Sequence, residues 1–232
     1  MNWSGTIPIY INNRNRLTTT RNLAKWFDDV AGVEVIIVDN ASSYEPLLKW
    51  YKECRYKVIR LAENCGHHAP WTQGCILWDH THRAIFGSEW YVVTDSDLDL
   101  ASVPKDLINH LLDGFYLFPS RVKVGVSLEI DDLPEWNRDR VRHWEQKFWD
   151  DPIEAIGSNS PEFFHADIDT TLAIYRSRTM HATAMTTNQG SLRSARPYTA
   201  RHTPWYLDPK NLSSEETYYF QHANGCTTWR PQ

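Results

Sequence analysis

Four short apolar segments near the amino terminus constrain the fold most, because segments with helical character alternate with them. The expected strands cover residues 7–11, 33–40, 56–61 and 90–95, and the expected helices cover 19–30, 42–54 and 69–86. The second segment, VEVIIVDN, is continuously apolar, as is typical of a parallel strand that is covered on both faces. The alternation therefore predicts an α/β fold, in which helices cover both faces of a mostly parallel central sheet.

The second half of the sequence is less regular. Strands are expected at 123–130 and 170–176, and helices at 104–114 and from Pro134 onward. Residues 186–209 are rich in Ser, Thr, Arg, Pro and Asn without a period, which predicts a long functional loop. No internal repeat or linker is evident, so the 232 residues are predicted to form a single domain.

Composition excludes several classes of function. The net charge of −5 argues against a nucleic-acid partner, because no basic stripe is present to neutralise phosphates. The four cysteines lack CxxC spacing and are expected to be free thiols in a reducing compartment. The amino terminus is polar by position 12, and the longest apolar run, 35–38, is too short to span a bilayer. We expect a cytoplasmic protein without an integral membrane segment, although its substrate could lie at the inner membrane surface.

Each of the four expected strands ends on polar or acidic residues. These residues are Asn12 and Asn13, Asp39 and Asn40, Asn64 and Gly66, and Asp95 and Asp97. Ligands of open α/β sheets bind outside the carboxyl ends of the strands, so the pattern predicts a shared cleft.

The sequence DSDLDL at the fourth strand end is the strongest chemical signal. In an extended segment, Asp95 and Asp97 would lie on one face. Convergent carboxylates suit a hard divalent cation such as Mg²⁺ or Mn²⁺, and the alternative is a solvated strand end. Asp99 would face the same side, and its role stays open.

Four motifs in this order resemble the nucleotide-sugar part of GT-A glycosyltransferases, close to the family-2 type. They are IPIYINNRNRL, VEVIIVDNAS, ENCGHHAPWTQG and WYVVTDSDLDL, and the resemblance covers about residues 5–100. It implies a GT-A, Rossmann-like fold with a nucleotide-sugar-binding half (about 1–100) and an acceptor and catalytic half (about 101–232). It also implies sugar transfer from a nucleoside-diphosphate donor, with UDP favoured, to a carbohydrate acceptor in a surface polysaccharide pathway. Mn²⁺ or Mg²⁺ would be the cofactor.

The resemblance also implies which residues bind the donor. They are Tyr10, Asn12, Arg16, Asp39, Asn64, Gly66, His67, Asp95 and Ser96. Asp39 would hydrogen-bond the base or ribose, or else start a turn. His67 and His68 depart from the family pattern and would either cap the next helix or touch the diphosphate. Asp95 would contact the ribose or a metal-bound water, and Asp97 would ligate the metal directly.

The second half must supply the base that an inverting transfer requires. A carboxylate takes the proton of the acceptor hydroxyl in such a reaction. Asp167 and Asp169 precede a strand and are the main candidates, Asp208 is the runner-up, and a plain strand-start pair is the alternative. A retaining enzyme would not need this base.

The segment YTARHTPWYLDP is expected to complete the site. The resemblance implies His202 as a further metal ligand and Arg201 as a phosphate contact. Trp205 and Tyr206 would stack on a sugar.

Two alternatives to a glycosyltransferase stay open. A sugar nucleotidyltransferase of the same fold would need a Gly-rich loop after the first strand, and INNRNRL contains no Gly. A non-catalytic carbohydrate- or nucleotide-binding module would leave the two acidic clusters unexplained.

Overall fold

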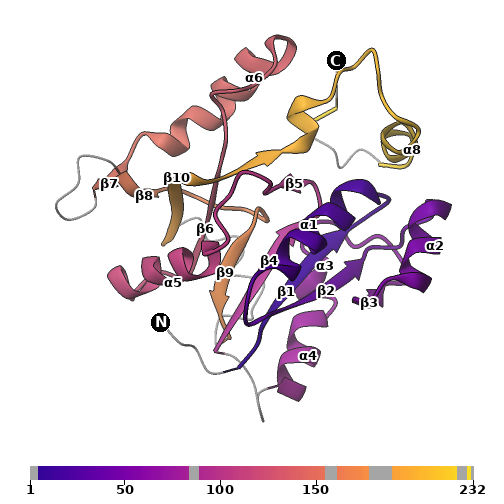
Figure 1. Cartoon of the computed structure of the whole chain (residues 1–232), viewed down its shortest axis with the longest axis horizontal. Coiled ribbons are helices and arrows are strands. Elements are labelled where there is room, and N and C mark those ends of the chain that lie inside the picture. The colour runs from indigo at the N-terminus through magenta and orange to yellow at the C-terminus, as the bar shows by residue number, and fades with distance from the viewer. Residues whose placement is uncertain (1–4, 84–88, 155–160, 178–189, 224–228, 231–232) are drawn as a thin grey trace.

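A computed structural model describes residues 5–83, 89–154, 161–177, 190–223 and 229–230 (Figure 1). The strands are β1 (Ile7–Asn13), β2 (Val33–Asp39), β3 (Lys57–Arg60), β4 (Trp90–Asp95), β5 (Leu98–Asp99), β6 (Lys123–Leu128), β7 (Pro152–Glu154), β8 (Pro161–His165), β9 (Ala173–Arg176) and β10 (Ser191–His202). The helices are α1 (Thr18–Asp28), α2 (Glu45–Glu53), α3 (Ala69–Thr72), α4 (Cys75–Arg83), α5 (Leu107–Leu117), α6 (Glu135–Glu145) and α8 (Ser214–His222). Two short 3₁₀ helices are η1 (Gln146–Trp149) and η3 (Thr203–Tyr206).

One mixed sheet runs through both predicted halves of the chain, in the order β3-β2-β1-β4-β9-β6-β10-β8-β7. The first four strands of this order are parallel, and β9 runs antiparallel to both β4 and β6. Within the parallel part, Asn13 is paired with Asp39, and Asn12 with Asp95. The register therefore brings three polar strand ends side by side, as the sequence predicted.

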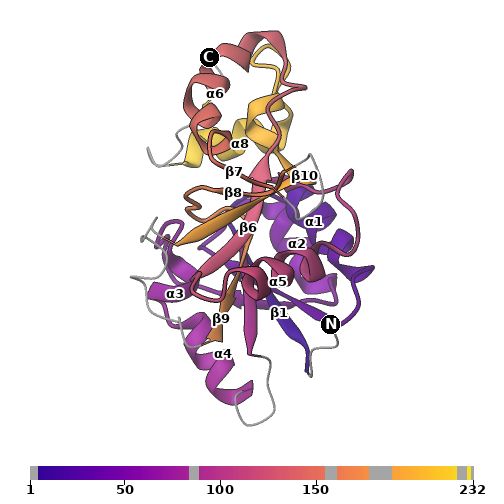
Figure 2. The same ribbon diagram turned by 90° about the vertical axis from the view of Figure 1, so that its left-hand side faces the viewer.

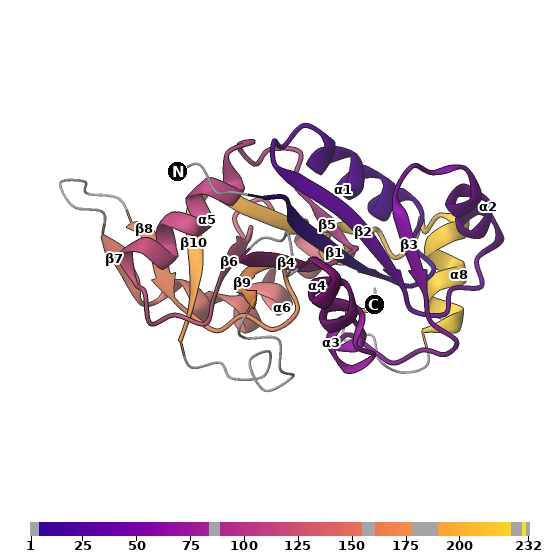
Figure 3. The same ribbon diagram turned by 90° about the horizontal axis from the view of Figure 1, so that it is seen from below.

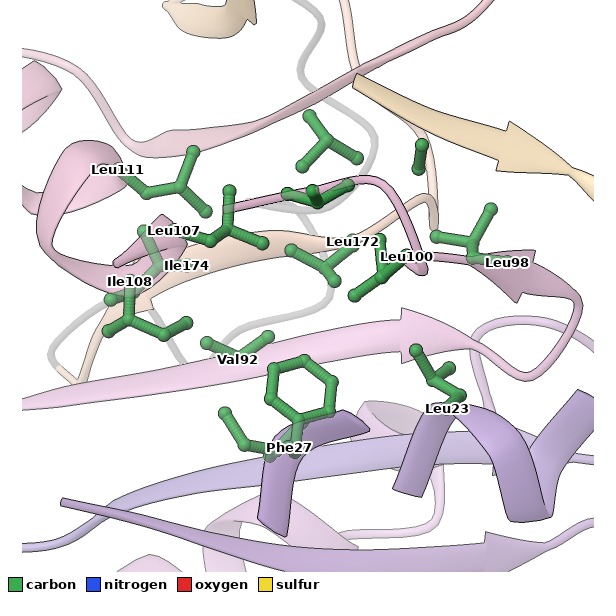
Figure 4. Packing of buried hydrophobic residues seen from close by; sticks show 14 of the residues in the cluster. Leu23, Phe27, Val92, Leu98, Leu100, Leu107, Ile108, Leu111, Leu172 and Ile174 are labelled. Carbon is green, nitrogen blue, oxygen red and sulfur yellow. The ribbon is translucent and has the colours of Figure 1, made fainter. Parts of the chain in front are cut away.

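Apolar layers cover both faces of the sheet, which confirms the predicted α/β fold class. On one face, α1 packs on alternate residues of β1 and β2, and α5 packs on β6, β9 and β10 (Figures 2 and 4). On the other face, Trp71 of α3 and Ile76 of α4 pack on the opposite set of strand residues (Figure 3). None of the helices in the described ranges is long and apolar enough to cross a membrane.

The prediction of a long loop over residues 186–209 is wrong for the part of this range that the structure describes. There, β10 occupies residues 191–202 and η3 follows it. β10 pairs in parallel with β6 and antiparallel with β8, and the register shifts between Ser194 and Thr199. This irregularity accommodates Pro197 in a strand. The strand was missed because several of its buried residues are polar, Arg193 and Ser194 among them, so its sequence shows no apolar period.

The prediction of a single helix over residues 69–86 is also wrong. It is divided into α3 and α4 at Gly74, which has a φ of +68°. Glycine accepts this left-handed conformation without strain. The sequence pattern missed β5, β7, β8 and α8 as well.

Gly125 in β6 lies so close to Leu172 and Ala173 that a larger residue would not fit there. A Cβ there would collide with the Leu172 carbonyl oxygen and lie 2.8 Å from the Ala173 Cβ. Gly125→Ala should lower the free energy of unfolding, measured by urea denaturation, by about 3 kcal/mol. Gly74→Ala is the matched comparison, because open space surrounds it and only its positive φ opposes the change. It should cost about 1 kcal/mol, and equal losses in the two variants would contradict the packing of β6 on β9.

Candidate functional site

Two adjoining cavities lie at the carboxyl edge of the parallel strands. The larger has a volume of about 740 Å³ and the smaller about 190 Å³. Arg16, His67, Asp95, Asp97 and Tyr219 line both cavities and so mark their junction. The sequence had placed four of these five residues in the site, and Tyr219 of α8 was not foreseen.

Asparagine side chains and backbone groups form the wall of the smaller cavity. Asn40 donates to the Gly66 carbonyl at 2.7 Å and accepts from the Cys65 N–H at 2.7 Å. Asn12 donates to the carbonyls of Gly66 and His67, and Asn64 accepts from the Gly66 N–H. This network fixes the turn after β3, where Gly66 has a φ of +76°.

Two acceptors in this wall remain available to a ligand. The Oδ1 atoms of Asn12 and Asn13 are buried and have no hydrogen-bond partner among the residues that the structure describes. Leaving such atoms unpaired costs free energy. The small cavity is therefore suited to a polar ligand that donates hydrogen bonds. Ser96, Asn64 and Gly66 also line it, as their predicted role in donor binding requires.

Asp95 and Asp97 both reach the junction, although the segment that carries them is not extended as expected. β4 ends at Asp95, and the chain turns at Ser96 and Asp97 before β5. Asp97 Oδ2 lies 3.5 Å from Arg16 Nη2 and 3.4 Å from His202 Nε2. Asp99, two residues farther along, binds the Ala101 N–H and lines neither cavity.

The two carboxyl groups at the junction have opposite pKa shifts. Burial, followed by the charges of Asp97 and Asp169, raises the pKa of Asp95 well above its ordinary value. Burial also opposes ionisation of Asp97, but the charges of His202 and Arg16 outweigh it and lower the pKa. The two acids thus differ in how readily they ionise, as expected for carboxyl groups in different environments.

Residues 166–171 form the opposite wall of the junction. The Thr170 hydroxyl donates to Asp95 Oδ2 at 2.7 Å, and the Thr171 N–H and hydroxyl donate to Asp169 Oδ1 at 3.2 Å. Burial opposes ionisation of Asp169, but backbone hydrogen bonds and Arg193 lower its pKa. Asp167 and Asp169 both line the larger cavity, as their role as candidate bases requires.

Two buried basic side chains, Lys123 and Arg193, donate hydrogen bonds to the backbone of this wall. Lys123 of β6 is fully buried and donates to the Ile168 carbonyl. Burial lowers the pKa of Lys123 to about 8, against the opposing charges of Asp169 and Asp167. Arg193 of β10 donates to the Asp167 carbonyl at 2.7 Å and forms a buried ion pair with Glu145 of α6.

The outer part of the larger cavity is aromatic. Trp144, Phe148, Trp205 and Trp229 line it, and Lys147 lies between Trp144 and Phe148, with Nζ 4.4 and 4.8 Å from the ring centroids. Trp144 is 53% exposed, whereas Trp205 is only 1% exposed. Trp144 therefore offers a ring face to a ligand, whereas Trp205, predicted to do so, is largely covered.

Tyr10 and Asp39, which were predicted to contact the donor, line neither cavity. Tyr10 is fully buried within the sheet, and its hydroxyl donates to Asp79 at 2.7 Å. Asp39 is also fully buried and accepts hydrogen bonds from Ser42 N, Tyr51 Oη and Arg60 Nε. The turn-starting alternative for Asp39 therefore holds.

Three residues predicted near the acceptor and diphosphate lie away from both cavities. Arg201 forms an ion pair with Asp132 at 2.6 Å, and the Tyr206 hydroxyl donates to the same carboxylate. Asp208 binds Lys210 N and Asn211 Nδ2. The structure therefore does not bring these three residues together with those that line the cavities, and their polar groups bind partners elsewhere.

The junction offers two protein ligands to a cation, Asp97 and His202. Asp97 Oδ1 and His202 Nδ1 are both buried without a hydrogen-bond partner in the described part of the chain. Within that part, no group of three or more His, Cys, Asp or Glu side chains is arranged to hold a metal. Mg²⁺ and Mn²⁺ sites that share a phosphate ligand need only one or two protein carboxylates, so these residues fit a cation bound together with a diphosphate.

His67 faces the junction, while His68 makes no side-chain hydrogen bond to the start of α3. The helix-capping alternative for the pair is therefore wrong for His68. Burial and the neighbouring His67 ring, 3.9 Å away, lower the pKa of His68.

The sequence matches no protein-family model and no curated protein. Among solved structures, it is similar to a mycobacterial protein, with 11% identity, coverage of 75% of this chain and 54% of that chain, and a TM-score of 0.42. It is also similar to glucosyl-3-phosphoglycerate synthase from Mycobacterium tuberculosis in complex with Mn²⁺, UDP and glucosyl-3-phosphoglycerate, with 14% identity, 75% and 57% coverage, and a TM-score of 0.41. The complex of that synthase with Mn²⁺, UDP-glucose and phosphoglyceric acid gives a TM-score of 0.39 at 14% identity, with the same coverage. The chain spans just over half the length of these proteins.

The pKa values of Asp95 and Asp97 are shifted in opposite directions, and the shift of Asp95 can be tested through protein stability. The raised pKa of Asp95 means that its stabilising, protonated form is lost as the pH rises through the folded-state pKa. Asn resembles the protonated acid at every pH. In EDTA, Asp95→Asn should raise the free energy of unfolding by about 1 kcal/mol at about pH 8 and change it little at about pH 4. A loss of stability at the higher pH would contradict the raised pKa of Asp95.

Proposed function

We propose that this chain transfers a sugar from a nucleoside-diphosphate donor, with UDP favoured, to a carbohydrate acceptor with the help of Mn²⁺ or Mg²⁺. The arrangement of side chains at the junction of the two cavities supports this proposal most strongly. An ionised Asp97 carries a free buried oxygen there, and a buried Arg16 lies beside it. A cation and a diphosphate together would complete the contacts that both groups lack.

The smaller cavity is suited to the nucleoside. Its polar wall of Asn12, Asn13, Asn40 and Asn64 provides directional hydrogen-bonding groups. Arg16 was expected to bind the donor, and its place beside Asp97 supports a contact with the diphosphate. Arginine binds phosphate oxygens in a fixed, charge-assisted geometry.

Asp97 and His202 would hold the cation at the junction. When bound, the cation neutralises the charge that develops on the departing diphosphate. Asp95 accepts a hydrogen bond from the Thr170 hydroxyl and would contribute negative charge once it is deprotonated.

The larger cavity is suited to the donor sugar and the acceptor. It includes the residues of the junction and the exposed Trp144, and aromatic rings of this kind stack on sugar rings. Asp169 lines the same cavity and is the preferred base, with Asp167 second. In an inverting transfer, the acceptor oxygen bonds to the anomeric carbon while the bond to the diphosphate breaks, and Asp169 takes the hydroxyl proton.

The direct test is release of nucleoside diphosphate from a panel of nucleotide sugars, with Mn²⁺ and with EDTA. Release that depends on Mn²⁺ and is greatest for one UDP-sugar is expected. Production of a nucleotide sugar from a sugar phosphate and a triphosphate would favour a nucleotidyltransferase. Binding of donor without turnover under any condition would favour a non-catalytic module.

Asp97→Ala should lower metal-dependent turnover by about a hundredfold or more, because it removes the free oxygen at the junction. Asp99→Ala is the matched control, since Asp99 belongs to the same acidic run but lines neither cavity. Circular dichroism and thermal melting should show that both variants fold. Equal activities of the two variants would contradict the cation site.

Asp169→Asn should lower kcat by roughly 10²- to 10⁴-fold and leave the KM for the donor nearly unchanged. Asp208→Asn, which alters a carboxyl group outside the cavities, should retain full activity. NMR of the product should show an inverted anomeric configuration. A retained configuration, or full activity of Asp169→Asn, would rule out this base.

A further inference from the structure

Helix α8 lies beside α1 and α2 although it is separated from them by more than 150 residues in the sequence (Figures 1 and 3). Ser213 and Glu216 form a capping box that fixes its first turn. Its side chains reach the donor side of the molecule, where Tyr219 lines both cavities. The nucleotide-sugar site is therefore not confined to the first half of the chain.

Glu215 attaches α8 to the start of α1. Its carboxylate accepts hydrogen bonds from Leu17 N at 2.9 Å, Thr18 N at 3.0 Å and Thr18 Oγ1 at 2.9 Å. Leu17, the residue at the amino end of α1, has no side-chain group to cap it. A carboxylate is favourable there, because the free N–H groups of a helix start carry partial positive charge. Glu215 thus fixes the backbone immediately after Arg16.

Tyr219 lies four residues after Glu215 and hence on the same face of α8. The Arg16 guanidinium carbon lies 3.8 Å from the centroid of its ring, while Arg16 Nη2 lies 3.5 Å from Asp97 Oδ2. Arg16 is 5% exposed, and its Nη2 forms no hydrogen bond with the described residues. The guanidinium is therefore clamped between a ring and a carboxylate, with a buried donor group left for an anion.

Three further contacts, made by Tyr218 and His222, hold the neighbouring face of α8. The Tyr218 hydroxyl donates to Ser43 Oγ at 3.0 Å, and its ring lies 5.1 Å from the ring of Tyr44. The His222 carbonyl accepts a hydrogen bond from Arg14 Nη2 at 3.3 Å. These contacts dock α8 independently of Glu215, so loss of that carboxylate alone should leave the helix attached.

We propose that Glu215 and Tyr219 are positioning residues of the donor site, which hold Arg16 in place to bind the diphosphate of a nucleoside diphosphate. The proposal rests on the proposed function for the identity of the ligand. Glu215 acts through the backbone of residues 17–18, and Tyr219 acts through the guanidinium itself. The carboxyl-terminal helix thereby sets the affinity for the donor, while the transfer step depends on the other wall of the larger cavity.

The test measures the Kd of UDP in the presence of Mn²⁺ by calorimetry for the full chain and four variants. Tyr219→Leu removes the ring, Tyr219→Phe keeps it, Glu215→Ala removes the cap, and Thr217→Ala alters an exposed residue of the same helix. Tyr219→Leu and Glu215→Ala should weaken UDP binding about tenfold, whereas Tyr219→Phe and Thr217→Ala should bind as the wild type does. Hydrogen exchange should show that UDP with Mn²⁺ protects residues 214–222 in the wild type.

Steady-state kinetics distinguish a positioning role of Tyr219 from a role in the stability of the fold alone. With a UDP-sugar, Tyr219→Leu should raise the KM for the donor about tenfold and leave kcat at saturating donor within about threefold. Wild-type affinity for UDP in both Tyr219→Leu and Glu215→Ala would overturn the inference and leave the proposed function intact. Unfolding of a variant would show as a lost melting transition, and hydrogen exchange of the wild type would then decide: no protection of α8 by UDP overturns the proposal. If wild type binds no nucleoside diphosphate, the proposed function itself fails.

Discussion

The cavities depend on one electrostatic arrangement, the ionised Asp97 held between Arg16 and His202. Each of these three residues comes from a different part of the chain: Arg16 follows β1, Asp97 follows β4, and His202 ends β10. The parallel register of β1 and β4 brings the first two together. The antiparallel pairing of β5 with β10, with Leu98 opposite His202, brings in the third. The fold thus concentrates charge at one edge of the sheet, and water or a ligand must solvate this charge.

Buried polar contacts hold the walls of the site. The Glu145–Arg193 pair links α6 to β10, and Arg193 and Lys123 fix the backbone around Ile168. Burial of charge is costly unless each group is paired, and removing one partner of such a pair is strongly destabilising. A rigid wall is consistent with a site that must hold two reacting groups in register, because small misplacements of reacting groups slow a reaction greatly.

The sequence predicted the parallel half of the sheet well, because its strands are short, apolar and flanked by helical periods. It also predicted the residues that cluster at the strand ends, since strand register follows from parallel pairing. Tyr10 and Asp39 were misplaced because their distance from a strand end in sequence does not reveal which face of the sheet receives the side chain. Arg193 and Tyr219 were missed for another reason. A buried arginine in a polar strand and a tyrosine on a weakly amphipathic helix carry no signal until tertiary contacts are known.

We propose that a cation and a diphosphate meet at Asp97. Crystals grown with UDP and MnCl₂ and measured at the manganese absorption edge would show whether they do. We expect an anomalous peak next to Asp97 and His202, with the diphosphate between that peak and Arg16. An anomalous peak elsewhere, or UDP bound without any metal at Asp97, would contradict it.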